Sequence, residues 1–300
     1  MDEITKIETI DQYDQLFGLE TLHPLVNVID FSKATKTVEY YHMNIGFYSL
    51  FLKDINCGDL KYGCNYYDYQ EGTVVCMAPG QVIGIDNRKK TPQRTKSIGV
   101  LFHPDLIRGT SLGQNIKNYS FFSYEVNEAL HLSEQEKEIV TDCIHKIQIE
   151  LEHAIDKHSK QLIVRNIELL LDYCMRFYER QFITRNQVNK DIIVRFEHLL
   201  DEYFQGQVAL TEGLPAVKYF ADKVCLSPNY FGDLIKKETG KTAQEYIQCR
   251  IIELAKERIL EGSQTVSQIA YELGFQYPQH FSRLFKKHVG YTPNEYKQQN

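Results

Sequence analysis

The sequence lacks the features of secreted, membrane-spanning and disulfide-stapled proteins. No stretch approaches the roughly 20 apolar residues that a transmembrane helix needs. Residues 1–6 (MDEITK) are acidic and lack the basic and apolar regions of a signal peptide. The seven cysteines are widely spread and form no Cys-x-x-Cys pair. We therefore predict a cytoplasmic protein with reduced thiols, without a disulfide framework or a structural zinc site.

Motifs for catalysis are missing as well. No Ser-His-Asp arrangement, P-loop or G-x-G-x-x-G occurs in a usable context, and residues 109–113 (GTSLG) are too loose to cradle phosphate. The histidines of the first 125 residues, His23, His42 and His103, are not paired at ligand spacing, so we expect no metal and no cofactor. An enzymatic alternative, a DNA-repair methyl acceptor, would need a four-cysteine zinc cluster that the cysteine spacing does not provide. We therefore predict that the protein is not an enzyme.

Length and composition indicate a folded chain of about two domains. The 300 residues are 43% hydrophobic and 25% charged, which excludes wholesale disorder. The net charge of −6 is unevenly spread, because residues 186–300 hold 14 Lys+Arg and 14 Asp+Glu and are neutral. A neutral domain can still bind DNA when its basic groups converge on one face, so the net charge excludes no nucleic-acid partner.

Two kinds of periodicity divide the chain. Residues 20–125 hold short runs of β-branched and aromatic residues between turn signals, which is typical of an antiparallel barrel or sandwich. Helical patterns follow at 134–155, after a capping box at Ser133, and at 159–181. We predict an α+β fold with an effector or dimerisation domain at 1–183, a polar linker at 184–190 and an all-helical domain at 191–300.

The last third of the chain contains a tandem repeat. Residues 217–224 align with 266–273 at an offset of 49, and the segment after the next turn aligns at an offset of 50. Each copy reads as a short helix with a central alanine, a tight turn and a second helix, which is the helix-turn-helix plan. Pro228 and Pro278 mark the starts of the second helices, and Gly240 and Gly290 mark their ends.

The second helix of each copy has a polar face suited to DNA. Asparagine and glutamine can read adenine with two hydrogen bonds, arginine can read guanine, and aspartate can accept from cytosine. We predict base contacts from residues on or beside these faces: Asn229, Tyr230, Asp233, Gln279, His280 and Arg283. We predict phosphate contacts from residues toward the helix ends: Ser227, Lys236, Lys237, Lys241, Lys286 and Lys287. The alternative is that each polar face is an ordinary solvated surface. That alternative would account for one such helix, but it accounts less well for the same polar spacing on both copies.

Residues 242–261 form one long helical pattern between the copies. A rigid connector fixes the distance between the two reading helices, which should be about 34 Å if they enter successive major grooves. Arg250, Lys256 and Arg258 on this connector could contact the DNA backbone, and a solvated surface explains them equally well.

The repeat resembles the AraC/XylS family of bacterial transcription regulators. The resemblance covers residues 190–298 and rests on SPNYFGDLIKKETGK at 227–241 and IAYELGFQYPQHFSRLFKKHVGYTPNEY at 269–296. It implies a seven-helix reader of two adjacent major grooves, with Asn229, Asp233, Gln279, His280 and Arg283 at base-contacting positions. One departure is Cys225, which stands where the second copy has Gly274. A positive φ there would cost about 1 kcal/mol or more.

The resemblance also implies a front domain that is a cupin-like barrel followed by helices that pair two subunits. A tyrosine cluster in this region, Tyr62, Tyr66, Tyr67 and Tyr69, either contacts a small-molecule effector or packs between strands. An apolar stripe on the second helix, Leu162, Asn166, Leu169, Tyr173 and Phe177, suits an intradomain core and a homodimer interface equally.

We therefore predict a sequence-specific regulator that docks two recognition helices on double-stranded promoter DNA. The resemblance favours activation through contact with RNA polymerase. The alternative is a small-molecule sensor whose DNA-binding domain is degenerate and weakly specific, because Gly232 and Asp233 give the first recognition helix few base-reading groups.

Overall fold

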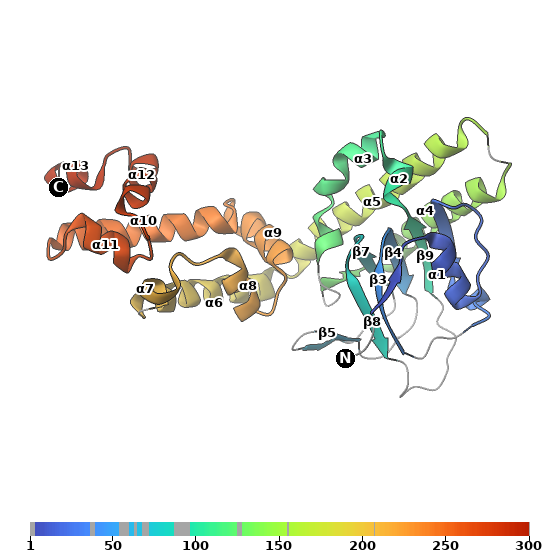
Figure 1. The fold of residues 1–300 in the computed structure, drawn as a ribbon, viewed down its shortest axis with the longest axis horizontal. Coiled ribbons are helices and arrows are strands. Elements are labelled where there is room, and N and C mark those ends of the chain that lie inside the picture. Colours follow the sequence, from blue (N-terminus) through green and yellow to red (C-terminus); the bar gives the residue numbers. More distant parts are fainter. Residues whose placement is uncertain are drawn as a thin grey trace. The chain divides into compact units, whose positions relative to one another are not determined.

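The chain forms two compact units, Met1–Thr184 and Arg185–Asn300, shown in Figure 1. The computed structural model describes residues 4–36, 40–53, 60–62, 65–67, 72–86, 97–124, 128–154, 156–206 and 208–299. None of the helices in these ranges combines the length and the apolar character that a membrane crossing requires.

The strands of the N-terminal unit form two larger sheets and a hairpin. One sheet has the order β1-β3-β8, the second has the order β10-β7-β4-β9-β2, and β5 pairs with β6. Their bounds are β1 (Thr5–Ile7), β2 (Val26–Asp30), β3 (Tyr40–Ile45), β4 (Tyr48–Lys53), β5 (Leu60–Tyr62), β6 (Asn65–Tyr67), β7 (Thr73–Met77), β8 (Val82–Asp86), β9 (Ser97–Phe102) and β10 (Leu130–His131). The mixed α+β class is confirmed, but the strands described here do not close into the expected barrel.

The core of this unit lies against the central strands. Strands β4 and β7 are apolar along nearly their whole length, and four or five successive residues of each are buried, as in strands covered on both faces. Phe47, Phe51 and Leu101 pack in one buried cluster with Ile10 from a helix near the N-terminus. The sheet is therefore held by aromatic and aliphatic side chains from segments far apart in sequence.

The helix that contributes Ile10 is α1 (Ile10–Phe17), which the periodicity analysis missed. A capping box starts it, because the Thr9 hydroxyl accepts from the Gln12 amide at 3.2 Å while the Gln12 side chain accepts from the Thr9 amide. Its Asp14 side chain is buried, and Oδ2 accepts from Thr21 at 2.7 Å and from Asn27 at 2.8 Å. Burial raises the pKa of the Asp14 carboxyl.

The segment after β9 is helical rather than extended, which corrects the β-rich interpretation of residues 103–123. It forms α2 (Pro104–Ile107), α3 (Ser111–Asn115) and the 3₁₀ turns η2 (Ile116–Asn118) and η3 (Ser120–Ser123), and another such turn, η1 (Phe31–Lys33), follows β2. Local caps explain the difference: His103 Nδ1 accepts from the Asp105 amide at 3.2 Å, and the Thr110 hydroxyl accepts from the Gly113 amide at 3.2 Å. Helices of four or five residues carry too little periodicity to be seen in the sequence.

Two long helices complete the N-terminal unit and pack against each other. Helix α4 (Glu134–Glu152) begins with the expected capping box, in which Ser133 and Glu136 satisfy each other's amides. Helix α5 (Ser159–Thr184) covers the second expected helix and extends it by three residues. Both helical predictions are confirmed.

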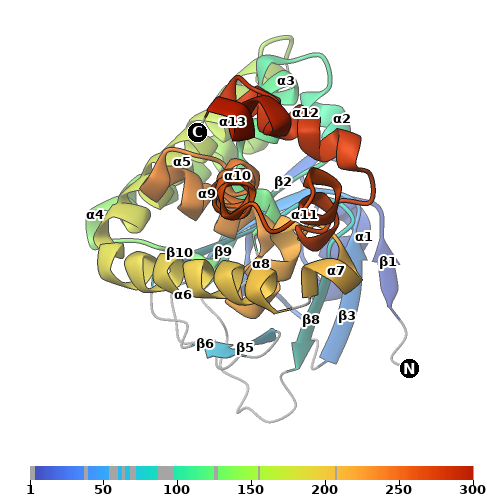
Figure 2. The same cartoon turned by 90° about the vertical axis from the view of Figure 1, so that its left-hand side faces the viewer.

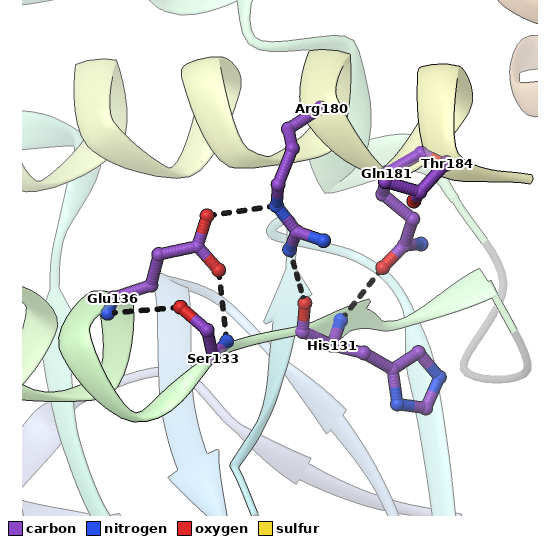
Figure 3. Close-up of polar contacts among 6 residues, drawn as sticks. All are labelled: His131, Ser133, Glu136, Arg180, Gln181 and Thr184. Carbon is purple, nitrogen blue, oxygen red and sulfur yellow. Dashed lines mark hydrogen bonds and ion pairs between the residues drawn. The ribbon is translucent and has the colours of Figure 1, made fainter.

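A polar network fixes the end of α5 to the edge strand β10 (Figure 3). The Arg180 guanidinium donates to Glu136 Oε1 at 2.7 Å and to the His131 carbonyl at 2.6 Å. The His131 amide donates to Gln181 Oε1 at 2.8 Å, and Gln181 Nε2 donates to the Ala129 carbonyl at 3.2 Å. Because the Gln181 side chain is buried, these bonds hold the last turns of α5 firmly on the sheet.

The C-terminal unit is entirely helical within the described residues. Its helices are α6 (Asn186–Gln205), α7 (Val208–Glu212), α8 (Val217–Lys223), α9 (Pro228–Thr239), α10 (Ala243–Glu261), α11 (Val266–Glu272), α12 (Pro278–Val289) and α13 (Pro293–Gln299). Figure 2 looks along α10, with the other helices of this unit arranged around it.

Helix α6 occupies most of the segment that we expected to be a linker. Only Arg185 interrupts the helical path between α5 and α6, with φ −92° and ψ 19°. The expected linker contains no glycine or proline to stop a helix, and its Asn189 is buried and donates to Glu238 Oε1 at 3.1 Å. The segment from residue 186 onward is therefore helical, and Asn189 binds it to the rest of the C-terminal unit.

Candidate DNA-binding surface

The tandem repeat forms two helix-turn-helix copies, α8 with α9 and α11 with α12. The central alanines of the first helices, Ala221 and Ala270, are fully buried, as close helix packing requires. Both turns pass through the left-handed region, with φ 59° at Cys225 and 89° at Gly274. The positive φ that we considered at Cys225 is therefore present, and Cys225 is the one non-glycine residue of the described chain that adopts such a φ.

The recognition helix of the first copy is α9. Ser227 caps it by accepting from the Tyr230 amide at 3.2 Å, Pro228 follows, and Gly240 ends it with φ 72°. Phe231, Leu234 and Ile235 are fully buried on its inner side. Asn229 is exposed and Asp233 is half-buried, so the outward face of α9 offers few groups to a partner.

Two residues of the first copy that we predicted to contact DNA are buried in the structure. The Tyr230 side chain is only 4% exposed because it lies on the inner side of α9. Ser227 is 3% exposed, and its hydroxyl is occupied as the helix cap. Neither side chain is presented to a partner, so we remove both from the set of candidate DNA contacts.

The recognition helix of the second copy, α12, has a richer outward face. Gln279, His280 and Arg283 are all exposed. Phe281 and Phe285 are fully buried on the opposite side. Leu284, which lies between them in the sequence, is half-buried.

An exposed tyrosine beside this face was not found by the sequence reasoning. Tyr277 precedes α12 and is 54% exposed, and its ring lies 5.5 Å from that of His280 in an edge-to-face arrangement. The sequence does carry a signal for it, because Tyr277 stands where the first copy has the capping residue Ser227. Its side chain makes no cap hydrogen bond.

The expected phosphate-contacting lysines are exposed at or just beyond the carboxyl ends of the recognition helices. They are Lys236, Lys237, Lys241, Lys286 and Lys287. Two hydrogen bonds from Thr242 are the main cause of a lowered pKa at Glu245, and the charges of Lys287 and Lys236 lower it further. Lysines from both copies therefore contribute to the electric field at the start of α10.

The connector α10 begins and ends where the sequence analysis expected. Thr242 and Glu245 form a capping box at its start, and its 19 residues span about 28 Å. In Figure 1, α9 lies at one end of α10, and α12 lies alongside α10, toward its other end. The long helix thus separates the two recognition helices within one unit.

The basic residues of α10 each form an ion pair with a carboxylate of the same unit. Arg250 binds Asp201 Oδ1 with two nitrogens at 2.9 and 2.7 Å, and Arg258 lies 3.1 Å from a Glu272 oxygen. Lys256 pairs with Glu253 one turn earlier at 2.9 Å. All three side chains therefore have a carboxylate partner within this unit, and the Lys256–Glu253 pair lies on the surface of α10.

The candidate effector residues of the N-terminal unit are only partly described. The backbones of Tyr62, Tyr66 and Tyr67 lie in β5 and β6. Their side chains, and the whole of Tyr69, lie outside the described residues. Among the residues that the structure does describe, no three His, Cys, Asp or Glu side chains are grouped to hold a metal ion.

The candidate dimer stripe on α5 is divided between surface and core. Leu162 and Leu169 are exposed, whereas Phe177 is buried. Asn166 and Tyr173 are half-buried, and the ring of Tyr173 stacks on that of Phe177 at 5.9 Å. The far end of the stripe therefore belongs to the unit's own core, while two leucines remain on its surface.

Comparisons with known proteins agree with this architecture. A family model described as a helix-turn-helix domain matches residues 220–299. The transposon Tn10 TetD protein of Escherichia coli is 33% identical over 144 residues, 48% of this chain and 91% of TetD. The HTH-type transcriptional regulator YtdP of Bacillus subtilis is 32% identical over 37% of this chain. The transcriptional activator RhaS of Escherichia fergusonii is 27% identical over 45% of this chain. The chain spans only 13% of YtdP and 46% of RhaS.

Proposed function

Because the chain belongs to the AraC/XylS family of helix-turn-helix transcription regulators, we propose that it binds double-stranded promoter DNA with α9 and α12 in successive major grooves. The observation that carries this proposal is the repeated geometry of the two copies. In each, a buried alanine and a left-handed turn hold a second helix whose opposite face is open to solvent.

The two copies contribute unequally to the choice of site. The exposed Gln279, His280 and Arg283 on α12 supply most of the groups that can read base edges. On α9, exposed Asn229 and half-buried Asp233 are the candidate readers. The second copy therefore determines most of the sequence preference, and the first mainly positions the protein.

The exposed lysines supply the affinity that does not depend on sequence. The candidates are Lys236, Lys237, Lys241, Lys286 and Lys287. Each phosphate neutralised by a lysine releases condensed counterions, so binding weakens as salt rises. With five such contacts, the slope of log K against log salt should be about −4 to −5.

An electrophoretic shift assay with promoter fragments from the source genome tests the proposal. A shift restricted to some fragments at 50 mM salt, surviving excess competitor DNA, supports sequence-specific binding. A uniform shift on every fragment favours the alternative of a degenerate, weakly specific DNA-binding domain. Absence of any shift contradicts DNA binding altogether.

Arg283→Ala tests the assignment of the reading residues. Loss of a two-bonded guanine contact costs about 1–3 kcal/mol and relaxes the preference at one base pair. A matched control is Lys297→Ala, which removes an exposed positive charge from α13 instead of α12. An equal loss of affinity on every sequence would show that Arg283 contacts only the DNA backbone.

The N-terminal unit, in this proposal, biases DNA docking through a small-molecule effector, a homodimer or both. The observation that supports a link is the network that fixes Arg180 and Gln181 of α5 to β10, a few residues before α6 begins at Asn186. The exposed Leu162 and Leu169 give α5 an apolar surface for a second subunit. Activation by contact with RNA polymerase, in the cytoplasm, fits the description of the relative RhaS as an activator.

A further inference from the structure

The two helix-turn-helix copies are connected by more than α10. Arg258, near the carboxyl end of α10, donates from Nη1 to Glu272 Oε2 on α11 at 3.1 Å. Its Nη2 donates to the Phe204 carbonyl on α6 at 3.3 Å. The Arg258 side chain is only 22% exposed. A single guanidinium therefore bonds to two helices besides its own.

Helix α6 belongs structurally to the first copy. The ring of Phe196 on α6 packs edge-on against Phe220 of α8 at 5.1 Å and against Phe231 of α9 at 5.0 Å. Farther along α6, Asp201 accepts both bonds from Arg250. Because α6 packs against α8 and α9, a hydrogen bond to the end of α6 connects Arg258 to the first copy.

Helix α11 belongs to the second copy, because it packs against α12 and leads into the turn at Gly274. That turn is also close to the loop after α7, since a β-carbon added at Gly274 would lie 2.6 Å from the carbonyl carbon of Gly213. The Tyr203 hydroxyl holds the same loop by donating to the Gly213 carbonyl at 2.9 Å. Two independent contacts therefore join the copies at the far end of α10.

We propose that Arg258, Phe204 and Glu272 form a clamp that fixes the rotation and spacing of α12 relative to α9. The consequence, which rests on the DNA docking proposed above, is that this protein reads the spacing between its two half-sites as well as their bases. Each added base pair moves a half-site by about 3.4 Å and turns it by about 35° around the DNA axis. A rigid pair of recognition helices cannot follow that displacement without losing contacts.

The chemistry of the clamp requires arginine. The planar guanidinium presents separate nitrogens in a fixed fork, so it can hold a carboxylate and a carbonyl at once. Lysine in its place offers one ammonium group on a flexible stem. Arg258 is thus a positioning residue that acts through the geometry of α12 and touches no base itself.

The test compares duplexes that differ only in half-site spacing. The probe is a duplex selected by the wild-type full chain from a random library, together with a version carrying one extra base pair between the two protected elements. Wild-type affinity should fall about tenfold or more on the longer duplex, because simultaneous engagement is lost. For Arg258→Met, which keeps an apolar stem of similar length, the fall should be about threefold or less.

Two variants control the comparison. Lys256→Met removes a neighbouring positive charge whose partner, Glu253, lies on the same helix, so this variant should keep the full spacing penalty of wild type. Glu272→Gln weakens the link to the second copy and should behave like Arg258→Met. It also serves as the test variant if Arg258→Met does not fold. Single base changes inside each half-site should weaken Arg258→Met and wild type by the same factor.

The outcomes are distinct. A relaxed spacing preference with unchanged base preference supports the clamp. A full spacing penalty in both Arg258→Met and Glu272→Gln overturns it and leaves the docking proposal intact. A wild-type protein that selects no two-part site overturns the docking proposal, and the clamp's role in reading DNA with it.

Discussion

Replacing Cys225 with glycine should stabilise the C-terminal unit. Cys225 sits in the turn of the first helix-turn-helix copy with φ 59°, where its β-carbon crowds the backbone. The equivalent residue of the second copy is Gly274, which has no β-carbon and adopts φ 89° without that crowding. Because the Cys225 side chain is exposed, the substitution removes little packing.

The size of the effect follows from two opposing contributions. Relief of the left-handed conformation should return about 1–2 kcal/mol. The greater freedom of glycine in the unfolded chain offsets about 0.5–1 kcal/mol of that gain. The net increase in the free energy of unfolding is therefore about 0.5–1 kcal/mol, which corresponds to roughly 2–6 °C in the melting temperature of a unit of this size.

Urea unfolding followed by far-UV circular dichroism measures this change, with Cys225→Ala as the matched control. Alanine removes the thiol but keeps a β-carbon in the left-handed turn, so Cys225→Ala should unfold within about 0.5 kcal/mol of wild type. If Cys225→Gly proves no more stable than Cys225→Ala, backbone strain at this turn is not the reason that glycine suits the second copy.

Three further substitutions test the fold. Gly274→Ala should destabilise the protein by about 2 kcal/mol or more, because the new β-carbon would lie 2.6 Å from Gly213 in a left-handed turn. A loss of unfolding free energy below about 0.5 kcal/mol, measured by urea unfolding, would refute that contact. Gly232→Ala should add about 0.5–1 kcal/mol of stability, since Gly232 lies within α9 with open space around it; an unchanged thermal midpoint would contradict this. The raised pKa of Asp14 means that the folded state favours its protonated form. Stability from Asp14 should therefore be full below pH 3.8 and fall as pH rises through the raised pKa. Chemical unfolding of wild type relative to Asp14→Asn across pH measures this, and a difference that stays flat or grows with pH would count against it.

The sequence predicted the helix-turn-helix unit well because its signals are local and occur twice. Pro228, Gly240 and Gly290 act through their own backbone geometry, so their effect does not depend on distant residues. The 49- and 50-residue offsets then made each copy a check on the other. The same reasoning identified Cys225 as the position where the copies differ in backbone strain.

The parts that the sequence did not predict depend on contacts between distant segments. Strand order, and hence the absence of a closed barrel among the described strands, is set by pairings such as β10 with β7. The burial of Tyr230 depends on how α9 packs against neighbouring helices, which helical spacing alone does not resolve. The partners of Arg258 lie 14 and 54 residues away, so no local pattern points to them.

Methylation protection of guanine N7 on a selected operator tests the central claim most directly, because that atom lies in the major groove. If α9 and α12 dock together, bound protein should protect two patches on one face of the duplex, with centres about 10–10.5 base pairs apart. In the Arg283→Ala variant, protection should be lost at the α12 patch before it is lost at the α9 patch. A single protected patch, or two patches on opposite faces of the DNA, would contradict simultaneous docking of the two recognition helices.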